Sequence, residues 1–121
     1  MDKNLMLTPA EEKLARLIWR KAPLSSPELV LLADWELDWK KSTTYTILKK
    51  LCDKGVFKNQ NAQVSVVLTR DALVELQSRR YVENTFDGSL PKFIATFMGG
   101  NKLSSKQAEE LKRLIAEYEK E

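Results

Sequence analysis

The chain has 121 residues, 43% hydrophobic and 31% charged, with 20 Lys plus Arg against 17 Asp plus Glu, a single cysteine and no histidine. These counts exclude a Cys/His zinc site, a Ser-His-Asp triad and a disulfide framework, and no glycine-rich phosphate loop occurs, so we expect neither an enzyme nor a bound cofactor. Because no window approaches the roughly 18 apolar residues of a membrane span, and the first seven residues lack the apolar stretch of a signal peptide, we expect one or two small domains in the cytoplasm.

Two helix starts near the amino terminus carry the same signal. Residues 8–11 combine a threonine N-cap, a proline at the first helical position and the glutamate of a capping box, which predicts a helix reaching about Lys21. After Pro23, residues 25–28 repeat the signal with Ser, Pro and Glu, and predict a second, short helix. Residues 35–39 show no helical stripe, so we expect them to form the turn before a third helix.

The third helix is predicted to end at Gly55, which fits a C′ stop. Its inward stripe has the i, i+3, i+4, i+7 spacing of Thr44, Ile47, Leu48 and Leu51. Its outward face and flanks present hydroxyl, phenol and amine groups, with one carboxylate: Ser42, Tyr45, Thr46, Lys49, Lys50 and Asp53. Such groups suit phosphates and base edges, and a helix surface selected for stability alone would carry better helix formers than Ser and Thr.

Positive charge is concentrated around this helix. Residues 40–58 hold six lysines against one aspartate, a net charge of +5, whereas residues 71–121 carry 8 basic and 9 acidic side chains. A basic block confined to one segment is typical of a polyanion site, although lysines also decorate ordinary solvated helices. The hydroxyl groups interleaved with the lysines favour the polyanion site.

After Gly55 the hydrophobic period changes from 3.6 to 2. Residues 56–58 enter a strand, residues 59–62 supply a turn, and apolar residues alternate over 64–68 in a second strand. Three helices followed by a hairpin predict a mainly α protein with a small β-hairpin, a winged helix-turn-helix domain over residues 1–70. In that architecture the third helix enters the major groove and the hairpin follows the DNA backbone.

The carboxyl-terminal part, residues 71–121, is predicted to be a helical dimerisation domain. Asp71 is expected to cap a helix that reaches about Phe86. A fifth helix with an apolar stripe is predicted over residues 90–98, before Gly99 and Gly100, and Ser104 begins the last helix. Two strongly apolar helices at this end have little of their own chain to cover them, so we expect them to pack against a second copy; packing back on the amino-terminal domain is the alternative. The predicted interface comprises Leu90, Phe93, Ile94, Phe97, Met98, Leu111, Leu114, Ile115 and Tyr118.

The order of these elements and several residues resemble the BlaI/MecI penicillinase-repressor family of winged-helix regulators. The amino-terminal resemblance is carried by Trp19, Trp39, Thr43, Thr46, Leu51, Lys54 and Gly55. The carboxyl-terminal resemblance is carried by residues 88–90 and by the segment from Leu103 to Ile115. The copper-responsive branch of the family ends in a cysteine-rich motif, which this chain lacks.

The resemblance implies a homodimeric repressor on a palindromic double-stranded DNA operator, controlling β-lactam resistance or a related stress response. It places the base-reading threonines on Thr43 and Thr46. Together with the charge pattern, it gives the DNA-binding set Lys40, Lys41, Ser42, Thr43, Tyr45, Thr46, Lys49, Lys50 and Lys58. In antibiotic-responsive members a membrane sensor metalloprotease triggers cleavage between Asn and Phe in the fifth helix, and the corresponding pair here is Thr96-Phe97.

Three alternatives accompany this interpretation. The domain could serve as a protein-interaction adaptor without DNA, because winged helices also do so. Cys52 could be a redox switch if Lys49 and Lys54 lower its pKa, but a small packing residue is the favoured interpretation. The alternating acids at 34, 36 and 38 lack the glycine and distal glutamate of a calcium loop, so we interpret them as a solvated acidic turn.

Overall fold

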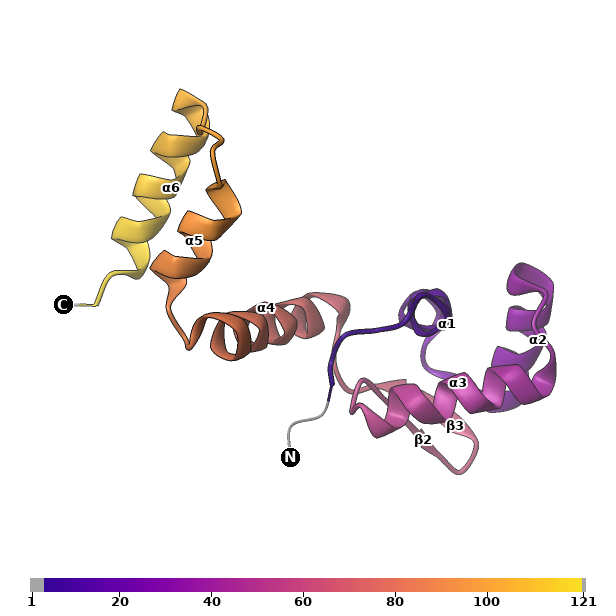
Figure 1. The fold of residues 1–121 in the computed structure, drawn as a ribbon. Helices are drawn as coiled ribbons and strands as arrows, with labels where there is room; N and C mark the ends of the chain where they lie inside the picture. The colour runs from indigo at the N-terminus through magenta and orange to yellow at the C-terminus, as the bar shows by residue number, and fades with distance from the viewer. Residues whose placement is uncertain (1–3, 121) are drawn as a thin grey trace. The chain divides into compact units, whose positions relative to one another are not determined.

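The computed structural model describes residues 4–120, which form six helices and one three-stranded antiparallel sheet (Figure 1). Three helices followed by a hairpin confirm the predicted mainly α, winged-helix fold. Within residues 4–120, no helix is both long enough and apolar enough to cross a bilayer. The elements are α1 (Pro9–Lys21), β1 (Leu24–Ser25), α2 (Ser26–Leu37), α3 (Lys41–Asp53), β2 (Phe57–Gln60), β3 (Gln63–Val66), α4 (Arg70–Phe86), α5 (Leu90–Met98) and α6 (Ser105–Tyr118).

The chain divides into two compact units within α4. The first unit extends to Tyr81, and the second begins at Val82. The start of α4 belongs to the first unit, where Leu73 is buried in its core. The cap of this helix differs from the prediction, because the Ala72 N–H donates to Thr69 Oγ1 at 3.1 Å and Asp71 lies inside the first turn.

Both amino-terminal helices begin as predicted, with complete capping boxes. The Glu11 N–H donates to Thr8 Oγ1 at 3.2 Å, and the Thr8 N–H donates back to Glu11 Oε1 at 2.8 Å. Ser25 and Glu28 make the same reciprocal pair at the start of α2. Because each box satisfies two otherwise orphaned N–H groups, the start of each helix is encoded within four residues of sequence.

The second helix is longer than predicted. Residues 35–37 are helical, so the predicted turn over 35–39 is wrong for its first three residues. The helix ends at Asp38, which adopts a left-handed conformation at φ 57° and donates its N–H to carbonyls one turn back. Leu37 packs partly buried against the core whereas Trp35 is 87% exposed, so tertiary packing at Leu37 extends a helix that shows no local stripe.

The wing is a hairpin with a two-residue turn. Asn61 and Ala62 have φ values of 53° and 60°, and positive φ at both positions gives the twist that closes such a hairpin. Asn59 and Gln60 belong to β2, so the predicted turn over 59–62 is too long by two residues.

The short strand β1 was not predicted from the sequence. In β1, Leu24 pairs with Val64 and Ser25 pairs with Gln63, which makes the sheet order β1-β3-β2. Two residues are too few to show an alternating pattern.

Helices α1, α2 and α3 pack with the sheet around one core (Figure 1). Trp19, near the end of α1, is held by two contacts. Its Nε1 donates to the Leu68 carbonyl at 2.9 Å, and its ring centroid lies 5.5 Å from that of Phe57. The inner face of α3 is buried at Thr44, Leu48 and Leu51. Burial of that face leaves the opposite face of α3 on the surface.

Candidate nucleic-acid interface

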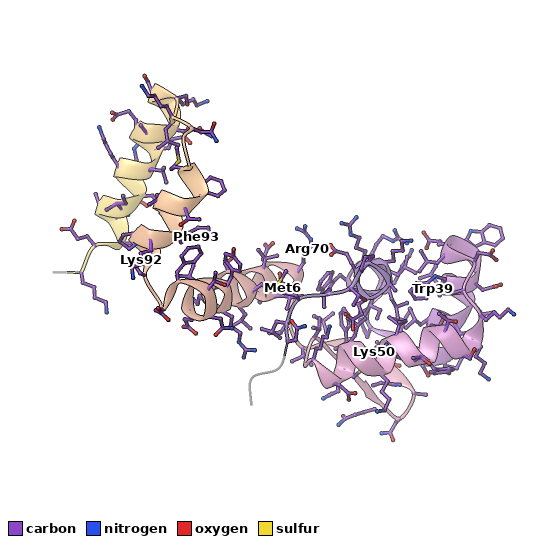
Figure 2. All side chains as sticks on the ribbon, viewed as in Figure 1. Met6, Trp39, Lys50, Arg70, Lys92 and Phe93 are labelled. Atoms are coloured by element: carbon purple, nitrogen blue, oxygen red, sulfur yellow. The ribbon has the colours of Figure 1, made fainter. Side chains whose placement is uncertain are left out.

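The outer face of α3 presents the predicted polar side chains to solvent. Of the nine predicted DNA-binding residues, eight are exposed and Tyr45 is half-buried. Lys50 is labelled on α3 in Figure 2. The exposed eight are Lys40, Lys41, Ser42, Thr43, Thr46, Lys49, Lys50 and Lys58, of which all but Lys58 lie on α3 or at its N-cap.

The first turn of α3 is suited to an anion. Its N-cap residue, Lys40, makes no side-chain cap hydrogen bond, and no acidic residue lies in the turn. The amide N–H groups at this end carry the positive end of the helix dipole, and Lys41, Ser42 and Thr43 surround them. A phosphate oxygen placed here would accept hydrogen bonds from both backbone and side chains.

Two of the predicted DNA-binding residues have side-chain partners within the protein. Tyr45 donates its hydroxyl hydrogen to Ser26 Oγ at 3.4 Å, which links α3 to the first turn of α2. Lys49 Nζ lies 3.6 Å from the Asp53 carboxylate, but both side chains are more than half exposed. A pair so exposed contributes little, so Lys49 can exchange Asp53 for a phosphate at small cost.

Lys54 does not belong to the exposed charge. Its Nζ lies 2.6 Å from Glu11 Oε1 and donates to the Met6 carbonyl at 2.9 Å, and its side chain is 18% exposed. Burial alone raises the pKa of the Glu11 carboxyl, but hydrogen bonds from Lys54 and the Thr8 backbone, together with the Lys54 charge, outweigh it and lower the pKa below its usual value. The basic block of residues 40–58 therefore exposes five lysines rather than six.

The wing adds amides that the charge pattern did not reveal. Four uncharged amide side chains lie within five positions and are all exposed: Asn59, Gln60, Asn61 and Gln63. Amide side chains can donate to phosphates and can bond base edges. These four amides could have been found in the sequence by their density at the hairpin tip, but a search for basic residues does not detect uncharged side chains.

Cys52 is a packing residue with a raised pKa. Its side chain is half-buried against the core and borders a hollow of about 400 Å³ beside Tyr45 and Asn59. Burial, and then the Asp53 charge, raise the pKa of the Cys52 thiol. The raised pKa disfavours the redox-switch alternative, in which Lys49 and Lys54 lower it, and Lys54 Nζ instead pairs with Glu11.

The acidic residues of α2 do not form a turn. Asp34 and Glu36 lie within the helix, and Glu36 Oε2 accepts a hydrogen bond from Arg20 Nη2 at 2.6 Å. Across the described part of the chain, no group of three or more His, Cys, Asp or Glu side chains is placed to hold a metal ion.

The second unit presents an apolar face. Each of its two last helices begins at a serine cap, Ser89 for α5 and Ser104 for α6, and neither helix has a buried residue. Three of the nine predicted interface residues are half-buried, namely Phe93, Met98 and Leu111. The six exposed ones are Leu90, Ile94, Phe97, Leu114, Ile115 and Tyr118.

The apolar face includes a hollow between α5 and α6. It measures about 450 Å³ and is lined mainly by apolar atoms, with Phe97, Leu111 and Leu114 among its walls. The rings of Phe86, Phe93 and Phe97 form a series with centroid separations of 5.6 and 6.0 Å. The predicted cleavage pair lies on α5, with Thr96 exposed and Phe97 73% exposed.

Comparison with known proteins gives two findings. The family model described as Penicillinase repressor matches residues 7–117, which cover most of each unit. A penicillinase repressor of Bacillus licheniformis is 21% identical over 122 residues, covering 98% of this chain and 95% of that protein.

Proposed function

The chain belongs to the penicillinase-repressor family, and from this premise we propose that it is a homodimer that binds a palindromic operator through α3 and the β2–β3 wing. The family is one of transcriptional repressors rather than enzymes, and it favours DNA binding over the adaptor alternative. The observation that carries the proposal is the outer face of α3, where lysines and hydroxyls are exposed around a helix start without acidic residues.

Within this interface, base reading and phosphate contact fall to different side chains. We assign base edges to Thr43 and Thr46, whose short hydroxyl side chains hold their donors close to the helix axis. The exposed lysines serve phosphates, because a flexible ammonium supplies charge without a fixed direction. The wing amides and Lys58 extend the contact along the backbone. Residues 1–70 thus form the DNA-binding domain of the proposal.

The dimerisation domain of the proposal, residues 71–121, has its contact surface on α5 and α6, within the second compact unit. Side chains such as Phe97, Ile115 and Tyr118 are more than 60% exposed, and contiguous apolar faces of this kind mark protein interfaces. A second copy offers the same face, so the two can cover each other about a twofold axis. Two recognition helices would then read half-sites about 34 Å apart, and their twofold relation implies a palindromic operator.

Inactivation by proteolysis at Thr96-Phe97 is a further part of the proposal. Cleavage between Thr96 and Phe97 would separate α6 and the end of α5 from the rest of the chain, and would divide the apolar face. Loss of the dimer would then release the operator. The proposed trigger is a membrane sensor metalloprotease responding to a β-lactam or a related stress, as the family resemblance of the sequence implies.

A footprint on the DNA upstream of the gene, repeated as binding curves over a range of salt concentrations, tests the proposal. Two symmetric protected half-sites are expected, with log affinity falling by about 0.9 per phosphate contacted for each unit of log salt. Absence of protection, or a flat response to salt, would exclude the operator-binding role and leave the adaptor.

A further inference from the structure

We propose that Lys54 is a positioning residue for operator recognition, which ties the carboxyl end of α3 to α1 and to the amino-terminal segment instead of contacting DNA. This inference rests on the proposed function, because the position of α3 has consequences only if α3 reads the operator. It also gives a role to the one lysine of residues 40–58 that lies outside the predicted DNA-binding set.

The tie is built on one buried carboxylate oxygen. Glu11 is 1% exposed, and its Oε1 accepts both the Thr8 N–H at 2.8 Å and a hydrogen from Lys54 Nζ at 2.6 Å. The first bond belongs to the capping box of α1, and the second comes from the C-cap residue of α3. A single atom therefore joins the start of one helix to the end of another.

Lys54 also forms a hydrogen bond with the segment before α1. Lys54 Nζ donates to the Met6 carbonyl at 2.9 Å, and Met6 is labelled on this segment in Figure 2. One residue earlier, the Leu5 carbonyl accepts a hydrogen bond from Gln77 Nε2 at 2.7 Å, and the Leu5 side chain is buried in the core. Residues 5 and 6 are thus held by α3 through Lys54 and by α4 through Gln77.

These contacts complete the support of the recognition helix. Near its amino end α3 is tied to α2 by the bond from Tyr45 to Ser26, and its middle is packed through Leu48 and Leu51. Lys54 supplies the polar tie at the other end. If its charge were removed, the buried Glu11 carboxylate would lose its cation and draw in water or a proton, so the two helix ends would separate.

Exposure separates this role from phosphate contact. The Lys54 ammonium is directed to two oxygens of its own chain, whereas Lys50, four residues earlier on α3, is exposed and has no such partner within residues 4–120. Replacing Lys50 removes a phosphate contact, but replacing Lys54 shifts the helix that carries the base contacts. The two substitutions should therefore change the affinities for operator and for random DNA in different proportions.

Glu11→Gln tests the positioning role, because that role and simple charge repulsion predict opposite changes in operator affinity. Removing a carboxylate from a DNA-binding protein ordinarily raises its affinity for DNA, because repulsion is reduced. If Glu11 holds α3 through Lys54, Glu11→Gln instead lowers operator affinity, by about tenfold if the equivalent of one base contact is lost. The matched control is Glu12→Gln, which removes the neighbouring, partly exposed carboxylate and should leave operator affinity equal or higher.

Lys54→Met and Lys50→Met are compared in the same way, at a temperature where circular dichroism shows each variant fully folded. Lys54→Met should lower operator affinity more than random-DNA affinity and leave the salt slope unchanged, and Lys54→Arg should restore much of the loss. Lys50→Met should lower both affinities and reduce the slope by about 0.9. A reduced slope for Lys54→Met, unchanged operator binding by it, or raised operator affinity of Glu11→Gln would overturn the positioning role.

Amide hydrogen exchange on the free protein tests the Lys54 contacts separately from operator binding. Lys54→Met should speed exchange at the last turn of α3, at Cys52 to Gly55, and leave the first turn of α2 unchanged. Unaltered exchange at those amides contradicts the tie itself, whatever the DNA data show. If the unmodified protein fails to bind its upstream DNA, the proposed function fails while the exchange result stands.

Discussion

Phe97→Asp tests the proposed dimer at a large exposed aromatic side chain of α5. Phe97 is 73% exposed in one chain, and an aromatic side chain offers about 200 Å² for burial. Covering that exposed fraction would remove about 150 Å² from water, worth about 3.5 kcal/mol at about 25 cal/mol per Å². A symmetric dimer contains two such residues, which doubles the gross figure to about 7 kcal/mol.

Association consumes part of this energy, because two chains lose rotational and translational freedom and their side chains become ordered. If half of it is realised, the dimer dissociation constant should rise about 300-fold in Phe97→Asp. The introduced carboxylate would also have to be desolvated, which adds to the effect. The variant should therefore become monomeric at a concentration about 300 times higher than the unmodified chain.

Sedimentation equilibrium over a range of concentrations measures the constant directly. Thr96→Asp is the matched control, since it places the same charge one residue away at an exposed position outside the apolar stripe, and it should remain a dimer. Operator binding by Phe97→Asp should weaken with the loss of the dimer, because each monomer reaches one half-site. If Phe97→Asp dimerises as tightly as the unmodified chain, the burial reasoning and the assigned face are both refuted.

Three further changes probe the interface and its support. Thr46→Ala should cost about 1 to 3 kcal/mol of operator affinity with little change on random DNA, and equal losses on both in a competition assay would remove its base-reading role. Lys50→Ala should weaken binding to all sequences and lower the slope of log affinity against log salt by about 0.9, whereas an unchanged slope would show that it touches no phosphate. Because the folded pKa of Glu11 is lowered, its ion pair stabilises the fold above the unfolded pKa of about 4.3 and is lost as pH falls through the folded value. The stability difference between the unmodified chain and Glu11→Gln, measured by urea unfolding, should therefore shrink from pH 7 to pH 3, and a constant difference would contradict the linkage.

Local features were predictable because the residues that create them are close in sequence. The capping boxes of α1 and α2 involve residues three apart, and the buried stripe of α3 repeats at helical spacing. The side chains opposite that stripe then had to face outward, so the exposed set of the candidate interface could be named from the sequence. Tyr45, which sits on the flank, is the member whose environment the pattern described least well.

Features that depend on contacts across the chain were missed. β1 exists because Leu24 meets Val64, forty residues later, and two residues carry no pattern of their own. The turn at Ala62 adopts positive φ without a glycine, since the pairing of β2 with β3 imposes it. The extension of α2 to Leu37 likewise depends on the core that receives that side chain.

The sequence alone determined where α1, α2 and α6 begin, which face of α3 is polar, that the last two helices carry an apolar face, and to which family the chain belongs. These properties follow from neighbours three or four residues apart and from composition. The tertiary structure decided which charges are available. Lys54 looks like Lys50 in the sequence, but Glu11, 43 residues earlier, lies beside it in the fold and accepts its hydrogen bond. A buried carboxylate needs a cation more than a solvated surface does, so the fold assigns one lysine of the basic block to its own interior.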